Sequence, residues 1–399
     1  MADLQPEVAL ARAAEHLFSM GLGDVAAEMS ARNMVFGLAK MHHVLLELGH
    51  PPDATFIATP DLTITRNENR WSAGVGYGGK LVWGPGDRPV VFLDVKPNCC
   101  GMLVGGLHEL PTLIEVTRRL DGMLEDRAEL EGVPIDWDIG AGNHFVDLMA
   151  VETVLPATDL PRWCFVMHFS GSELRGENPL GMGLYWDHSR ELRRRMRVFD
   201  TPWGPCRTLL DEDALAYWEF FQRAEAFACR RREMAAERLF DDFTIIANLH
   251  HQGLAHPNAM LLGCQDTSGG GLVPVMLRES TPGYLFRPLP NLADDIIDVL
   301  GWRERAQRHG VLDELRRANI IPHGAGYMLP GLSRLVEVHT MGVRRYYEVE
   351  ASEGGVHIML GIPRDLTFAY RGRRVILSSA EYRLGEIAAR LQPLSVLKA

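Results

Sequence analysis

The sequence lacks several features that mark particular classes of protein. Six cysteines in 399 residues are too few for the disulfide framework of a small secreted domain, so we expect a cytoplasmic protein. The first residues lack the basic and apolar segments of a signal peptide. No uninterrupted apolar run reaches the roughly 20 residues of a membrane-spanning helix, so no membrane partner is expected. We find no internal repeat, low-complexity tract or linker, and predict one domain over residues 1–399.

An excess of basic residues is also missing. The formal net charge is −11, which argues against a protein that coats nucleic acid non-specifically, and we predict no DNA partner. Arginines cluster at residues 190–197 and 230–232. Solvated helix faces are the simpler interpretation of both clusters, although a local basic groove is compatible with the overall charge.

The composition, 46% hydrophobic and 23% charged, is that of an ordinary globular protein. Apolar spacing predicts both helices and strands, and therefore a mixed α/β fold that begins with a helical segment within residues 1–50. The predicted helices cover 6–49, 109–131, 211–240, 293–318 and 381–391, and the predicted strands lie within 54–106 and 162–170. Residues 262–292 are rich in Gly and Pro, which indicates loops and short strands.

Residues able to carry chemistry follow the predicted strands or lie in Gly-rich turns. Cys100 comes after an apolar run, Asn143 and His144 follow two glycines, and His168 precedes a Ser-Gly-Ser loop. Each has a structural alternative: a buried cysteine, a capped turn, or a histidine satisfied by hydrogen bonds.

Two further histidine positions raise the same question. His250 and His251 are adjacent, and because neighbouring residues on a strand face opposite ways, only one of them can point into a given site. His323 opens a Gly-Ala-Gly turn. For both positions a satisfied structural histidine is the competing interpretation.

Together these residues supply one thiolate and several imidazoles. Such donors suit Zn, Mn, Fe or Co better than Mg or Ca, which prefer oxygen ligands. Because the residues are scattered over more than a hundred positions, the pattern favours a catalytic centre over a local zinc finger. We therefore predict a metal site built from Cys100, His144, His168 and one of His250 and His251, with His323 beside the ion.

The order of these pieces resembles the RtcB family of RNA-splicing ligases, from about Thr59 to the C-terminus. Cys100-Gly101-Met102 resembles the family's Asp-x-x-Cys-Gly-Met segment, and residues 140–145 resemble Gly-Gly-Gly-Asn-His-Phe. Residues 168–172 resemble His-Ser-Gly-Ser-Arg with Phe169 inserted, and residues 323–326 match His-Gly-Ala-Gly-Arg. Residues 369–371 and 391–398 resemble the family's closing motifs.

The resemblance implies a compact α/β domain with central sheets and outer helices, and a ligase mechanism. His323 would take up guanylate from GTP, and the guanylate would pass to an RNA 3′-phosphate before a 5′-hydroxyl attacks. Mn²⁺, or Zn²⁺ or another divalent transition metal, would neutralise phosphate charge. The implied partners are GTP, as a guanine nucleotide, and RNA ends. The implied nucleotide and phosphate contacts are Asn143, Ser170, Gly171, Ser172, Gly324, Ala325, Gly326 and Lys398.

Several positions depart from the family pattern. Pro97 stands where the family has a metal-binding Asp, and Tyr327 replaces an Arg. His251 falls where the family has a ligand His, which the resemblance implies is a metal ligand here, but the Asn that follows it in the family is Gln252. The family's basic His-Arg-Lys-Gly-Ala segment corresponds to residues 263–267, which carry no basic side chain. These losses leave two alternatives to the ligase: a diverged metalloenzyme acting on another, perhaps small, substrate, and an inactive metal-binding subunit.

Overall fold

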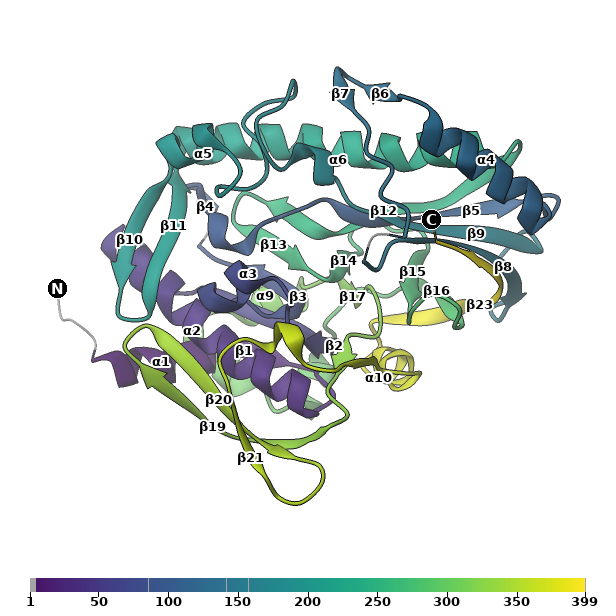
Figure 1. The fold of residues 1–399 in the computed structure, drawn as a ribbon. Helices are drawn as coiled ribbons and strands as arrows, with labels where there is room; N and C mark the ends of the chain where they lie inside the picture. Colours follow the sequence, from purple (N-terminus) through teal and green to yellow (C-terminus); the bar gives the residue numbers. More distant parts are fainter. Residues whose placement is uncertain (1–4, 85, 141, 157, 399) are drawn as a thin grey trace.

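A large, mostly antiparallel sheet forms the centre of the protein. The computed structural model describes residues 5–84, 86–140, 142–156 and 158–398, and Figure 1 shows their arrangement. In spatial order the sheet runs β1 (Leu17–Ser19), β2 (Thr55–Thr63), β3 (Tyr77–Val82), β13 (Ala259–Leu262), β12 (Phe243–His256), β5 (Cys100–Leu107), β9 (Trp163–Phe169), β8 (Phe145–Thr153), β23 (Gly385–Leu397), β16 (Gly283–Pro288) and β15 (Val273–Met276). β1 and β2 pair in parallel, and the other neighbours in this sheet are antiparallel.

Smaller sheets surround the large one. Three strands form a sheet beside it: β10 (Arg197–Thr201), β11 (Gly204–Leu210) and β4 (Val90–Phe92). Another three form the antiparallel sheet at the bottom of Figure 1: β19 (Leu332–Met341), β20 (Arg344–Ala351) and β21 (His357–Leu360). Two-stranded pairs are β14 (Cys264–Asp266) with β17 (Ile320–Pro322), β18 (Tyr327–Met328) with β22 (Ala369–Tyr370), and β6 (Glu129–Leu130) with β7 (Val133–Pro134).

Helices cover the outside of these sheets. The longest, α6 (Asp211–Leu239), packs on β5 and β12 with α4 (Leu113–Glu125) beside it, while α2 (Val25–Glu47) packs on β2 (Figure 1). The other helices are α1 (Pro6–Glu15), α3 (Glu68–Ala73), α5 (Arg190–Arg195), α7 (Asp294–Val299), α8 (Arg303–His309), α9 (Leu312–Arg316) and α10 (Arg374–Glu381). Central sheets with outer helices agree with the predicted mixed α/β class.

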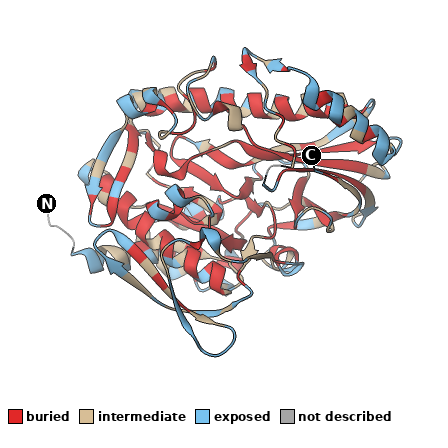
Figure 2. Ribbon diagram, in the orientation of Figure 1, coloured by how far each residue is buried: buried red, intermediate tan, exposed pale blue. Residues whose placement is uncertain are grey.

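The buried residues are concentrated in the central sheet (Figure 2). The central strands are almost wholly buried in Figure 2, and β5 is buried at every position. None of the helices in the described ranges is long and apolar enough to cross a membrane.

The helix predicted over 293–318 is divided into three short helices, α7, α8 and α9, and two further predicted helices also differ from the structure in extent or kind. The helical segment predicted over 6–49 is broken at Leu17–Ser19, because these residues pair with β2 as strand β1 and bury Phe18. The helix predicted over 381–391 is mostly strand: α10 ends at Glu381, and β23 begins at Gly385. The segment at residues 386–391, Glu-Ile-Ala-Ala-Arg-Leu, suits a helix, but pairing of β23 with β8 and β16 on both sides outweighs that preference.

Candidate metal centre

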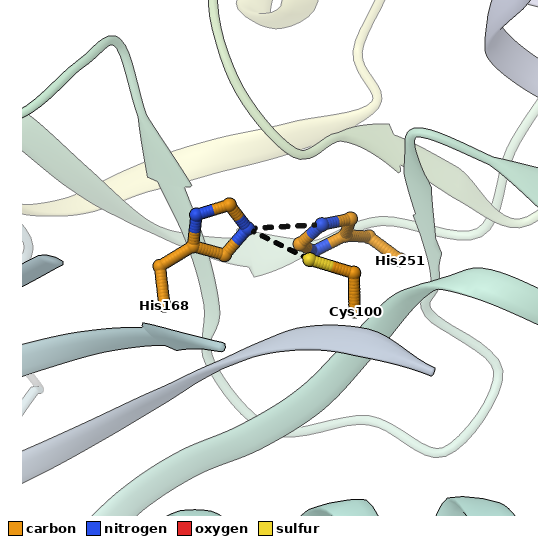
Figure 3. Close-up of side chains that lie close together, drawn as sticks. All are labelled: Cys100, His168 and His251. Carbon is orange, nitrogen blue, oxygen red and sulfur yellow. Dashed lines mark hydrogen bonds between the residues drawn. The ribbon is translucent and has the colours of Figure 1, made fainter. Parts of the chain in front are cut away.

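Three of the predicted ligands lie on adjacent strands of the large sheet. Cys100 begins β5, His168 stands near the end of β9, and His251 belongs to β12 on the other side of β5. His168 pairs with Met102, two residues after Cys100, so Cys100 and His168 share one face of the sheet. Figure 3 shows the three side chains converging.

A β-bulge in β12 decides which of the two adjacent histidines joins the group. His250 pairs with Gly101 and Gln252 with Cys100, so His251 is an extra residue in its strand. His251 therefore reaches Cys100 and His168, while His250 forms an ion pair with Glu225 of α6 instead. The choice between His250 and His251, which the sequence leaves open, is made by this local register shift.

The geometry of the three donors fits one transition-metal ion. Nε2 of His168 lies 3.2 Å from Sγ of Cys100 and 3.3 Å from Nε2 of His251. Two nitrogen ligands of a tetrahedral ion, each about 2.0–2.1 Å from it, are roughly 3.3 Å apart. All three side chains are buried, and Nδ1 of His251 has no hydrogen-bond partner among the described residues. This buried Cys/His/His group could hold a divalent metal ion.

Neighbouring groups orient the His168 ring and lower the pKa of the Cys100 thiol. Nδ1 of His168 donates to the carbonyl oxygen of Asn143 at 2.8 Å, so Nε2 is the ring nitrogen left to meet an ion. Burial alone would raise the pKa of the Cys100 thiol, but His168, His251 and His144 outweigh burial and lower that pKa well below its usual value. Cys100 is thus placed to act as a thiolate, the form that binds metals.

His144 lies at the edge of the group and has its own carboxylate. Its Nδ1 is 2.9 Å from Oδ2 of Asp138, and its ring meets that of His168 edge to face. Burial lowers the pKa of His144, but Asp138 and then Cys100 outweigh burial and raise it to about 10. Asp138 is itself held by Arg231 of α6, whose Nη2 lies 2.7 Å from Oδ1. A carboxylate that fixes a histidine ring is a common support for a ligand.

His323 lies on the other side of His251. The two rings are tilted by 33° with their centroids 4.3 Å apart, and Nδ1 of His323 faces the Gly263 carbonyl oxygen at 2.7 Å and Oδ2 of Asp61 at 3.3 Å. Burial lowers the pKa of His323, but Asp61 and the Gly263 carbonyl outweigh burial and leave it raised. Because both partners meet Nδ1, the other ring nitrogen, Nε2, is free to meet a ligand.

The turn after His323 packs tightly against the strand that carries Asp61. Gly326 has a φ of 65°, and a Cβ at this position would lie 2.3 Å from the Asp61 carbonyl oxygen. Only glycine allows this approach. The Gly-Ala-Gly turn therefore brings His323 and Asp61, more than 250 residues apart in sequence, into contact.

A cavity of about 320 Å³ opens beside these residues. Its lining contains Cys100, His144, His168, His323 and the predicted contacts Asn143, Ser170, Gly324, Ala325 and Gly326. Gly171, Ser172 and Lys398 do not line it in the part of the chain described. Lys398 pairs with Glu279, whose side chain does line the cavity, at 3.1 Å. Ala141 of the predicted Gly-rich motif lies outside the described residues.

Several residues of the site were missed by the sequence reasoning. Asp61 and Asp138 support two of the histidines, and Arg66, Arg175 and Arg278 line the cavity from three separate segments. Asp61 is fully buried. The sequence signal for it was a carboxylate within a mostly apolar predicted strand, in the segment Ala58-Thr59-Pro60-Asp61-Leu62. The arginines give no local signal, since only the fold brings them together.

Asp94, the carboxylate nearest to Pro97 in the sequence, is not one of the residues grouped around Cys100. Asp94 accepts from the backbone N–H and the guanidinium of Arg207, at 3.1 and 2.9 Å, and does not line the cavity. Among the described residues, the group of potential metal ligands at Cys100 contains histidines and no carboxylate.

Comparison with known proteins adds no relative. No model of a protein family matches the chain, and no curated protein matches it either. The resemblance to RNA-splicing ligases therefore rests on the motifs themselves, and the function must be argued from the site.

Proposed function

We propose that the protein is a metal-dependent guanylyltransferase of the RNA-ligase type, in which His323 carries guanylate between GTP and an RNA 3′-phosphate. One observation carries the proposal: His323, with Nδ1 held by Asp61 and Gly263, stands in a cavity wall against the Cys/His/His group. A nucleophilic histidine needs this arrangement, with one nitrogen fixed and the other free.

The chain's own residues account for the first half-reaction. Nε2 of His323 would attack the α-phosphorus of GTP, forming a nitrogen–phosphorus bond while the bond to the leaving pyrophosphate breaks. Asp61 would stabilise the positive charge that develops on the ring, as a buried carboxylate does for other catalytic histidines. Because the pKa of His323 is raised, the free nucleophile should become more abundant above neutral pH.

The cavity has properties that suit a nucleotide and a phosphate end. Its volume lies in the range of small-molecule sites. Arg66, Arg175 and Arg278 are exposed and line it, and guanidinium groups bind phosphate oxygens in pairs. Tyr327 and Tyr370 add aromatic surface. A metal ion held by Cys100, His168 and His251 would supply a Lewis acid for the phosphate oxygens.

The second half-reaction defines the substrate class. An RNA 3′-phosphate would take the guanylate from His323, and a 5′-hydroxyl would then attack the activated end and release guanosine monophosphate. This sequence leaves a normal phosphodiester between the two RNA ends and restores the free histidine.

A second candidate is a metalloenzyme on the same scaffold that acts on a small substrate. Two positions favour it: Tyr327 in place of the family's arginine, and Pro97 in place of the metal-binding carboxylate. Loss of a fixed guanidinium removes a bidentate phosphate contact. An inactive metal-binding subunit is the third alternative, and retention of the His323–Asp61 pair argues against it.

The proposal is tested by adduct formation. Purified protein is incubated at mildly alkaline pH with Mn²⁺ and GTP labelled at the α-phosphate, and the labelled residue is then mapped by mass spectrometry. We expect an acid-labile adduct on His323 in wild type and in the control His256→Ala, which removes an exposed histidine from β12. His323→Ala should form none.

The adduct-forming protein should then join an RNA 3′-phosphate to a 5′-hydroxyl. Label that persists in His323→Ala would show that His323 is not the acceptor. If wild type forms no adduct with Mn²⁺, Zn²⁺ or Co²⁺, the ligase proposal fails and the small-substrate metalloenzyme becomes the better account.

A further inference from the structure

The outer sheet formed by β19, β20 and β21 carries a second group of potential metal ligands. The group consists of two glutamates and two histidines. β19 carries Glu337 and His339, β20 carries Glu348, and β21 carries His357. None of them lines the cavity of the central site. The sheet lies at the bottom edge of Figure 1, and much of it is exposed in Figure 2.

The strand register places all four side chains on one face. Glu337 pairs directly with Glu348, and His339 is two residues further along β19, so these three side chains point the same way. Glu348 pairs with Met359 on the other side, and His357 is two residues before Met359. His357 therefore also shares that face.

The opposite face of the sheet is anchored in the protein. Tyr347 and Val349 alternate with Glu348, are fully buried, and belong to a cluster with residues of α2. The Tyr347 hydroxyl donates to Oδ1 of Asn33 at 2.6 Å. The sheet is thus fixed on one side, which holds the four polar side chains together on the other.

The side chains of the group lie close together. Nε2 of His339 lies 2.8 Å from Oε2 of Glu348, and Nδ1 of His357 lies 2.5 Å from Oε1 of the same carboxylate. Donor atoms of Glu337, His339 and Glu348 all lie within 4.8 Å of one another.

The two negative charges of Glu337 and Glu348 also favour a bound cation. Glu337 and Glu348 stand directly opposite each other, and like charges in that position are destabilising. Glu337 forms no ion pair with a basic side chain anywhere in the described ranges. A divalent ion bound between the two glutamates would offset the charge of both carboxylates.

We propose that Glu337, His339 and Glu348, with His357 at their edge, form a second metal site, which binds Zn²⁺ or a similar divalent transition ion. Imidazole and carboxylate are ordinary zinc ligands. The ion would join β19 to β20 on their solvent face, beside His357 of β21, so its main effect would be to stabilise this sheet. The site lies on a different sheet from Cys100 and depends on none of the central ligands.

The test uses full-length protein with Cys100→Ser, which removes the central thiolate, so that success or failure here is independent of the proposed function. Isothermal titration with Zn²⁺ should show one equivalent. Adding His339→Ala, or separately Glu348→Gln, should weaken that equivalent at least tenfold. The matched control is His43→Ala, because His43 pairs with Glu47 on α2 at 3.0 Å but has no further ligand beside it.

Circular dichroism of each variant checks that it is folded, and Glu348→Gln serves if His339→Ala is not. The proposal is overturned if the Cys100→Ser protein binds no Zn²⁺. It is equally overturned if affinity is unchanged by both His339→Ala and Glu348→Gln, or if His43→Ala weakens binding as much as they do.

Discussion

At the scale of single residues, the centre depends on how few donors surround Cys100. Pro97 cannot replace a carboxylate, and Asp94 is held by Arg207 away from the cavity. The donors within reach suffice for one ion bound by Cys100, His168 and His251, with His144 at its edge. We therefore expect one metal equivalent that depends on Cys100.

This number is measured by titrating Mn²⁺ or Zn²⁺ into wild type and into Cys100→Ser. The difference between the two proteins should be one tight equivalent per chain. A difference of two would mean that a second ion shares Cys100, and no difference would remove Cys100 from the metal site.

Asp61 provides a second test at the residue scale. Asn keeps the size of the side chain but removes the negative charge that faces Nδ1 of His323. If His323 is the guanylate acceptor, Asp61→Asn should slow adduct formation by on the order of a hundredfold, as loss of assistance to a catalytic histidine commonly does. Thermal unfolding should confirm that the variant is folded. A folded Asp61→Asn protein with the wild-type rate would leave Asp61 without a catalytic role.

At the scale of elements, a cluster of two buried histidines and one half-buried histidine joins the N-terminal helices to α8. His16 follows α1, His42 lies in α2 and His309 ends α8, and the His16 ring lies 4.8 Å from that of His42 and 4.6 Å from that of His309. Burial first, and then neighbours that include His309 and Arg12, lower the pKa of His16 to about 3 and that of His42 to about 4.

Both rings are neutral in the folded protein at pH 5, whereas in the unfolded chain they bind protons below about pH 6.5. The unfolded state then holds more protons, so stability falls as pH drops from about 6.5 toward the folded pKa values. At pH 5 the loss should be roughly 2 kcal/mol for each histidine.

Urea unfolding at pH 7.5 and pH 5 measures this loss. His42→Gln, which keeps a hydrogen-bond donor for the Ala54 carbonyl, should reduce the pH dependence, and the neighbouring half-buried His43→Gln should not. If His42→Gln and wild type lose equal stability between the two pH values, the buried ring of His42 is not responsible.

The elements also show what the sequence can and cannot predict. The long helix over 211–240 and the strand over 162–170 were predicted closely, because their apolar periodicity is strong. β23 was not, since its segment Glu-Ile-Ala-Ala-Arg-Leu at residues 386–391 suits a helix and only its two partner strands make it a strand. The metal-ligating residues could be proposed from local motifs, whereas the choice of His251 required a bulge that no local pattern reveals.

At the scale of the whole molecule, the positions of the charged residues matter more than the net charge. The formal net charge is −11, yet Arg66, Arg175 and Arg278 meet at one cavity. These residues come from segments far apart in the chain, so composition could not predict a local basic surface. The prediction of weak affinity for nucleic acid in general is therefore compatible with recognition of a phosphate end.

The sheet connects the two ends of the chain. β1 lies at one edge, near residue 17, while β23, which ends at residue 397, pairs with β8 inside the same sheet. The site strands β12, β5 and β9 lie between these two regions. An ion bound to them would therefore be held by the middle of the sheet.

The central claim, that a thiolate of the central sheet binds a transition metal beside His323, is tested most directly by the absorption spectrum of the protein loaded with Co²⁺. Wild type should show a thiolate-to-cobalt charge-transfer band with one equivalent of Co²⁺, and Cys100→Ser should not. His323→Ala should keep the band, because His323 stands next to the Cys/His/His group and is not part of it. Absence of the band in wild type, or its persistence in Cys100→Ser, would contradict the assignment.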